Sequence, residues 1–179
     1  MTDGRQSERQ VVEVFVEIPR GSRNKYEYDR QRGLFVLDRV LYSSVHYPTD
    51  YGYIPDTLAL DGDHLDALVV VNEPTFPGCI IETRPIGVLH MRDEKGDDSK
   101  ILGVPIGDPR LEGIGDLSGL SPHWLLEIEN FFATYKTLQG LIAETLGWEG
   151  LEAAWSMIAE CRHRYSEALQ MVEWSPKGT

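Results

Sequence analysis

The chain has 179 residues, enough for one domain with a substantial core, and its 41% hydrophobic and 26% charged residues are typical of a globular protein. Its formal net charge of -12 at pH 7 argues against nucleic acid or an anionic membrane surface as a partner. Its two cysteines, Cys79 and Cys161, lie far apart and exclude a disulfide framework or a zinc site.

The first ten residues are polar and contain no signal-peptide core, so we expect them to be frayed. No later segment is a long apolar run of the length that a membrane span needs. We find no repeat or low-complexity linker. These observations predict a cytoplasmic protein with a single domain over residues 1–179.

Alternation of apolar and polar side chains predicts a half-buried β-strand over residues 11–18, with Glu17 near its end. Residues 25–28 alternate again and place Lys25 and Glu27 on one face, where Glu27 can converge with Glu17. Residues 34–41 read as a further strand, and Arg39 lies inside this apolar segment. A buried arginine needs a partner, but an arginine on an edge strand or with a snorkelling side chain is the more common case.

Three tyrosines follow, Tyr47, Tyr51 and Tyr53, mixed with Pro and Gly in residues 47–55. This mixture predicts an irregular loop with an aromatic face. Their rings can pack in the core or their hydroxyl groups can reach a ligand, and spacing does not decide between the two.

An acidic cluster occupies residues 61–66, where Asp61, Asp63 and Asp66 precede the apolar run at residues 67–71, a predicted buried strand. Carboxylates this close repel one another, and a bound cation neutralises them. Oxygen ligands without nearby Cys favour Mg²⁺, Mn²⁺ or Ca²⁺. The alternative is a solvated acidic turn, because Asp-Gly is itself a turn pattern.

The next segments read as strands at residues 80–81 and 87–91, then a polar turn over residues 93–100 and an apolar strand over residues 101–104. Strand, turn and strand form a hairpin pattern. The turn carries four acids and two lysines and is a second candidate site, although a mixed-charge hairpin tip is more often solvated surface.

After a Gly- and Asp-rich loop at residues 107–119, Ser121 and Pro122 mark a helix start, with Ser121 as the N-cap. We expect this helix to end near residues 139–140 and a last helix to span residues 151–172, with an apolar face that includes Leu169 and Val172. Short strands followed by helices predict an α+β domain whose strands close into a small barrel covered by C-terminal helices.

Several segments together resemble the bacterial type of family I soluble inorganic pyrophosphatase. The resemblance extends from Val14 to Trp148, and several motifs in one order are more specific than any single motif. The segments that carry it are residues 17–19, 24–27, 37–39, 47–53, 61–66, 93–100 and 131–136.

The resemblance implies a five-stranded OB-like barrel with helices packed outside, a homohexamer, and hydrolysis of pyrophosphate to two phosphates. It also implies several Mg²⁺ ions, with Mn²⁺ or Zn²⁺ as substitutes, and a metal-bridged water that attacks the substrate. The metal-ligating residues that it implies are Glu17, Asp61, Asp66, Asp93 and Asp98; Glu27 lies near Glu17.

The same resemblance assigns Asp63 as the base that accepts the proton of the attacking water. The phosphate-binding residues that it implies are Lys25, Arg39, Tyr51, Lys100, Tyr135 and Lys136; Tyr47 is expected to line the same cavity. The chemistry of these residues agrees, because cations spread over two phosphates stabilise the charge of the transition state.

Two departures from the family pattern stand out. His64 occupies the position after the middle Asp where the family most often has Pro, and no lysine follows Lys136 within the next five residues. Consecutive residues of an extended segment face opposite ways, so we expect the His64 ring to point to solvent, away from the side that Asp61 and Asp63 face. Metal ligation or an electrostatic effect on Asp63 are the alternatives.

Three other functions compete with this interpretation. A calcium-binding module lacks support, since Leu65 stands where an EF-hand needs an oxygen ligand. An oligonucleotide-binding barrel has the wrong charge. A pyrophosphatase-fold paralogue that binds metal and phosphate compounds with little turnover is the strongest alternative.

Overall fold

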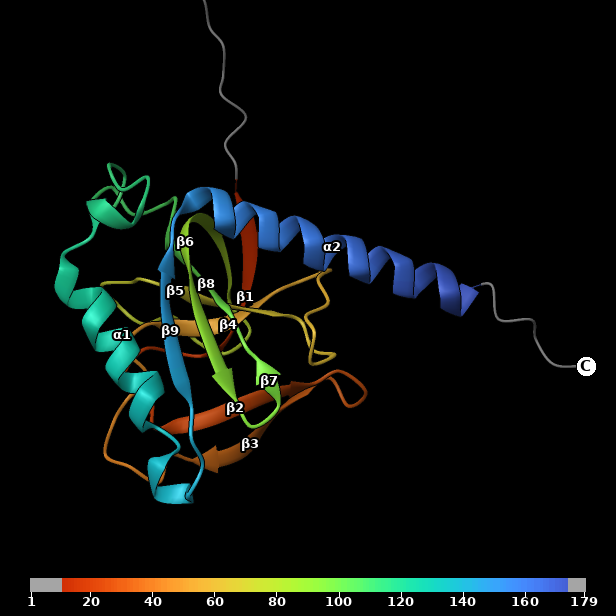
Figure 1. Cartoon of the computed structure of the whole chain (residues 1–179), viewed down its shortest axis with the longest axis horizontal. Helices are drawn as coiled ribbons and strands as arrows, with labels where there is room; N and C mark the ends of the chain where they lie inside the picture. The colour runs from red at the N-terminus through yellow and green to blue at the C-terminus, as the bar shows by residue number, and fades with distance from the viewer. Residues whose placement is uncertain (1–10, 174–179) are drawn as a thin grey trace, which may run out of the picture.

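A closed ring of five strands forms the centre of the computed structural model, which describes residues 11–173 (Figure 1). The ring runs β1–β4–β5–β8–β6 and closes through the pairing of β6 with β1. Its one parallel pair joins β5 and β8, and the other pairs are antiparallel. The ring strands are β1 (Val12–Ile18), β4 (Asp50–Ile54), β5 (Leu65–Val69), β6 (Ile80–Asp93) and β8 (Lys100–Pro105).

The remaining elements extend or cover this ring. β7 (Gly96–Asp97) and β9 (Glu144–Glu149) pair with β6, while β2 (Asn24–Asp29) and β3 (Leu34–Val40) form a separate two-stranded sheet. The helical elements are α1 (Pro122–Thr134), α2 (Leu151–Glu173) and the 3₁₀ turns η1 (Leu117–Gly119) and η2 (Thr137–Gln139). The predicted α+β barrel with outer helices is therefore confirmed. The prediction of frayed residues 1–10 lies outside the described residues, and the single domain over residues 1–179 stays a prediction.

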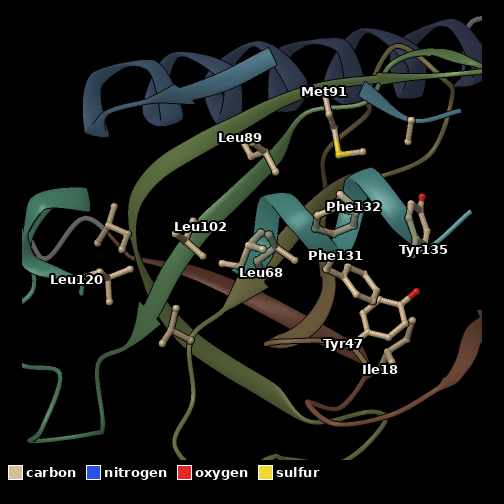
Figure 2. Packing of buried hydrophobic residues seen from close by; sticks show 14 of the residues in the cluster. Ile18, Tyr47, Leu68, Leu89, Met91, Leu102, Leu120, Phe131, Phe132 and Tyr135 are labelled. Atoms are coloured by element: carbon tan, nitrogen blue, oxygen red, sulfur yellow. The ribbon is translucent and has the colours of Figure 1, made fainter. Parts of the chain in front are cut away.

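Two clusters of apolar side chains hold the ring and its helices together. One contains Phe131 and Phe132 of α1, packed with Leu68 of β5 and Leu102 of β8 (Figure 2). The other joins the inward valines of β1 to α2, which contributes Ala154, Ile158 and Cys161. Helix α2 leaves the barrel beyond this contact, where Leu169 is 50% exposed, so the predicted apolar face is wrong at Leu169 (Figure 1). The side chain of Val172 lies outside the described part.

Two predicted boundaries in the strands are wrong. Residues 47–55, which we expected to form a loop, contain β4. Gly52 lets β4 approach the neighbouring strand β1 closely and does not form a turn. The expected pair of short strands at residues 80–81 and 87–91 is one strand, β6, which passes Pro85 through a register shift. Proline donates no ladder hydrogen bond, and the irregular register accommodates it.

The C-terminal half also departs from expectation in three places. The strand β9 was not predicted, since its six residues carry Gly147 in a left-handed conformation at a register shift. Helix α1 ends at Thr134 rather than near residue 139, and η2 then ends at the left-handed Gly140. Ser121 is the N-cap residue as predicted, but its side chain makes no capping hydrogen bond.

The sheet β2–β3 settles the question about Arg39. Within residues 11–173, strand β3 pairs only with β2, and Leu34, Leu37 and Val40 on it are about half exposed. Arg39 therefore lies on an edge strand, which was the simpler of the two interpretations. No helix in residues 11–173 combines the length and the apolar character that a membrane crossing requires.

Gly52 gives a direct test of the ring closure. A methyl group at this position would overlap the carbonyl oxygen of Phe15 in the neighbouring β1. We expect Gly52→Ala to lower the free energy of unfolding by about 2 kcal/mol or more, as overpacked cores do. Gly113→Ala is the control, because its methyl group meets nothing within 4 Å. Chemical denaturation compares the two, and equal stability would contradict the packing described here.

Candidate active site

All of the predicted site residues line one cavity of about 750 Å³. They come from β1, β2, β3, β4, β5, the β6–β8 hairpin, the loop before β5 and the segment after α1. The cavity thus gathers residues that lie more than one hundred positions apart in the chain. The predicted residues on its wall are Glu17, Lys25, Arg39, Tyr51, Asp61, Asp63, Asp66, Asp93, Asp98, Lys100, Tyr135 and Lys136.

Lys100 is the most buried charged residue of the site, with 2% of its surface exposed. Its Nζ atom lies 2.7 Å from Asp66 Oδ2 and 2.8 Å from Asp98 Oδ1, and it donates to both. Burial alone would lower the pKa of Lys100, but the charges of Asp66 and Asp98 outweigh it and raise this pKa above its ordinary value. Lys100 therefore stays charged and neutralises two carboxylates.

The aromatic wall beside Lys100 comes from β4 and α1. The Tyr51 hydroxyl donates to Asp66, and the Lys100 ammonium lies 5.5 Å from the Tyr51 ring centroid and 5.2 Å from that of Phe132. The Tyr51 and Phe132 ring faces attract the cation. Tyr47 was expected on the cavity wall, but it is buried behind Tyr51, with the ring centroids 5.4 Å apart.

Crowded carboxylates line the same side of the cavity. Burial is the main cause that raises the pKa of Glu17 to about 7. A hydrogen bond from the Tyr28 amide lowers this pKa, and the negative charge of Asp66 raises it further. Burial also raises the pKa of Asp98, and Lys100 opposes this effect. These acids hold their protons more tightly than free ones, so a cation that binds here competes with those protons and favours the ionised carboxylates.

The other predicted phosphate-binding cations also contact carboxylates. Lys136 Nζ donates to Asp93 Oδ2 at 2.7 Å and to Glu94 Oε1 at 2.9 Å. Burial would raise the pKa of Asp93, but its hydrogen bond from Lys136 holds that pKa below its ordinary value.

The cations on the small sheet are paired in the same way. Lys25 pairs with Glu27 and lies 3.4 Å from Asp38 Oδ2. Arg39 donates to Asp38 Oδ2 at 2.6 Å and to Gln139 Oε1 at 3.1 Å. The cavity wall therefore carries alternating positive and negative groups.

His64 does not point to solvent, so that prediction is wrong. Its ring stacks on Tyr53 with centroids 4.7 Å apart, and its Nδ1 atom lies 2.5 Å from the Thr57 carbonyl oxygen. Burial lowers the pKa of His64. The residue bends out of the extended geometry that we assumed, since Gly62 has a φ of 91° and turns the chain before it.

Three polar residues of the site were given no individual role from the sequence, although Glu94 was counted among the acids of the 93–100 turn. Asp38 pairs with Lys25 and Arg39, Glu94 pairs with Lys136, and Gln139 accepts a hydrogen bond from Arg39. Asp38 and Glu94 stand next to predicted residues, and this adjacency was an available indication. Gln139 comes from the unpredicted turn η2, and nothing in the sequence pattern connects it to Arg39.

The site offers oxygen ligands but no preformed group of three. Across residues 11–173, no three His, Cys, Asp or Glu side chains are gathered so that they could hold a metal ion. Lys100 instead places a positive charge between Asp66 and Asp98. A hard divalent cation suits carboxylate ligands of this kind, so the donor set fits such an ion.

Comparison with known proteins gives one consistent result. The family model described as inorganic pyrophosphatase matches residues 14–166. The inorganic pyrophosphatase of Geobacillus stearothermophilus is 54% identical over 160 residues, which are 89% of this chain and 97% of the relative. That of Methanosarcina acetivorans is 55% identical over 161 residues, 90% of this chain and 96% of the relative.

A solved structure agrees with the sequence matches. The inorganic pyrophosphatase of Thermus thermophilus superposes with a TM-score of 0.85 at 44% identity, over 93% of this chain and 97% of that chain. The similarity therefore includes both the sequence and the barrel with its helices.

Lys100→Met tests the buried charge pair. Without the ammonium group, Asp66 and Asp98 face each other without a counter-charge, and we expect the unfolding free energy to fall by about 3 kcal/mol. The control is Lys95→Met in the same hairpin, an exposed lysine whose loss should change stability by less than about 0.5 kcal/mol. Thermal and chemical denaturation in a chelator-treated buffer measure both. Similar stability of the two variants would show that the pair contributes little.

Proposed function

The chain belongs to the inorganic pyrophosphatase family of hydrolases, and from this we propose that it hydrolyses pyrophosphate to two phosphates with the help of Mg²⁺. The observation that carries the proposal is the set of paired opposite charges around one cavity. A site built only to bind an anion needs no carboxylates, and one built only to bind a metal needs no lysines. A substrate that arrives with divalent cations uses both.

We assign the ligand set to cavity carboxylates from β1, the loop before β5, β5 and the β6–β8 hairpin. Asp61, Asp66 and Asp98 would hold one ion, Asp93 with Asp98 another, and Glu17 a further one with Glu27 nearby. When bound, Mg²⁺ neutralises the carboxylates and the substrate oxygens and lowers the pKa of water. Mn²⁺ or Zn²⁺ can substitute in such a ligand set.

The cations and hydroxyl groups of the wall would bind the two phosphates. Each cation would exchange a carboxylate partner for a phosphate oxygen; the four are Lys100, Lys136, Lys25 and Arg39. Binding thus replaces one ion pair with another and leaves no cation without a counter-charge. Tyr51 and Tyr135 add hydroxyl donors. These groups stabilise the charge that spreads over the phosphate oxygens in the transition state.

Asp63 is the proposed general base. It lies in the loop before β5, lines the cavity and is exposed, so a water molecule in the cavity can reach its carboxylate. Its side chain forms no ion pair with a lysine or arginine in residues 11–173. It is therefore free to accept the proton that the attacking water loses.

Phosphate release from pyrophosphate, with and without Mg²⁺, tests the proposal. We expect turnover with Mg²⁺ and none after chelation. The alternative, a paralogue with little turnover, predicts instead that calorimetry detects binding of Mg²⁺ and of a phosphate compound without phosphate release. A cytoplasmic location also stays a prediction.

Asp63→Asn separates the chemical role from binding. The amide cannot accept the proton, and we expect kcat to fall by about a hundredfold or more. Calorimetric Mg²⁺ binding should change little. Asp97→Asn, which removes an exposed carboxylate of the β6–β8 hairpin outside this cavity, is the control. Near-normal turnover of Asp63→Asn would remove Asp63 from the role of base.

We also propose that the protein assembles as a homohexamer. Apolar side chains of α1 and of the segment that follows it support this, since Leu126, Leu138 and Ile142 are between 61% and 82% exposed. Isolated exposed residues are ordinary, but several in one region mark an interface. Sedimentation velocity at micromolar concentration should show a species six times the chain mass of 20.3 kDa. A monomer alone would refute the proposal.

A further inference from the structure

The last helix, α2, contacts the loop of residues 57–64 that carries Asp61 and Asp63. The amide of Leu58 donates to the carbonyl oxygen of Cys161 at 2.9 Å, and Arg164 Nε donates to the carbonyl oxygen of Leu58 at 2.9 Å. Both polar groups of one loop residue thus bind to a single turn of α2. Arg164 is itself held, because its Nη2 atom lies 3.0 Å from Cys161 Sγ.

A third contact joins α2 to the other end of this loop. The Tyr165 ring lies 6.1 Å from the His64 ring, which stacks on Tyr53 on its own side. Tyr165 also lines the cavity, although it comes from the last helix of the chain. Ring pairs at these separations attract one another weakly and fix relative orientation.

Hydrogen bonds inside the loop transmit these contacts to its acidic tip. The Thr57 carbonyl oxygen lies 2.5 Å from His64 Nδ1, within hydrogen-bond distance. The Thr57 hydroxyl accepts a hydrogen bond from the Leu65 amide at 2.9 Å. The Ala59 amide donates to the Asp63 carbonyl group at 2.7 Å. The loop is therefore closed at its base, and a displacement of Leu58 moves Asp63 with it.

We propose that α2 is a positioning element of the active site, and that Arg164 and Tyr165 hold the loop so that Asp61 and Asp63 face the cavity correctly. This inference rests on the proposed function, since it gives the position of Asp63 a catalytic meaning. Neither residue needs to touch the substrate. Their effect is on geometry, and small displacements of a reacting group cost up to about a hundredfold in rate.

The experiment compares Arg164→Ala and Tyr165→Leu with Arg162→Ala, an exposed arginine on the same helix. Tyr165→Leu removes no charge, so it separates positioning from electrostatics. Hydrogen exchange of a peptide covering residues 56–66 is measured first, because it requires neither metal nor turnover. In Arg164→Ala we expect the protected amides of Leu58 and Ala59 to exchange at least about tenfold faster, with barrel peptides unchanged.

Kinetics and a conservative variant complete the test. We expect kcat to fall by about tenfold in Arg164→Ala and Tyr165→Leu while KM for pyrophosphate stays within about threefold. Arg164→Lys, which keeps a donor for the Leu58 carbonyl oxygen, should recover part of kcat. Arg162→Ala should match the wild type in every measurement.

Two results would overturn the proposal. The first is that residues 56–66 exchange in both variants at the rate seen in Arg162→Ala. The second is that the wild type is active and the two variants exchange faster in this segment but keep the wild-type kcat. A wild type without turnover would instead refute the proposed function. The exchange data would then still decide whether α2 holds the loop.

Discussion

The ammonium group of Lys100, enclosed between Asp66 and Asp98, is the contact on which the site depends. A buried ammonium is tolerated only with close counter-charges, and crowded carboxylates only with a close cation. Each of the three residues thus makes the position of the other two possible. They come from β5, the hairpin and the first residue of β8, so the pairing also fixes how these parts of the ring meet.

The other charged pairs follow the same rule with more exposure to solvent. Lys136 with Asp93, and Arg39 with Asp38, are two further cations that lie near a carboxylate. The cavity wall is nevertheless net negative before ligands enter, because nine Asp and Glu side chains line it against six Lys and Arg side chains. Metal ions and an anionic substrate can then enter by exchanging partners, which avoids a state with a large unbalanced charge.

The sequence predicted which residues line one cavity better than it predicted the strands. The order of the family motifs identified the cavity residues from Glu17 to Lys136. A motif is recognised by its residue types, so this identification did not depend on correct strand boundaries. The missed features all depend on contacts between distant segments: Gly52 against Phe15, Pro85 within a paired strand, and Gln139 beside Arg39. His64 was misplaced because strand alternation was applied to a segment that turns at Gly62.

The closure of the ring has a consequence for synthesis of the chain. Strand β1 is made early, yet its partner β6 follows about seventy residues later, and the helix that holds the 57–64 loop is made last. Contacts between such distant segments form slowly and only once both are present. A growing chain on the ribosome therefore carries all the carboxylates of the site long before it has Lys136 or α2 to order them. The site becomes complete only when the final helix has emerged.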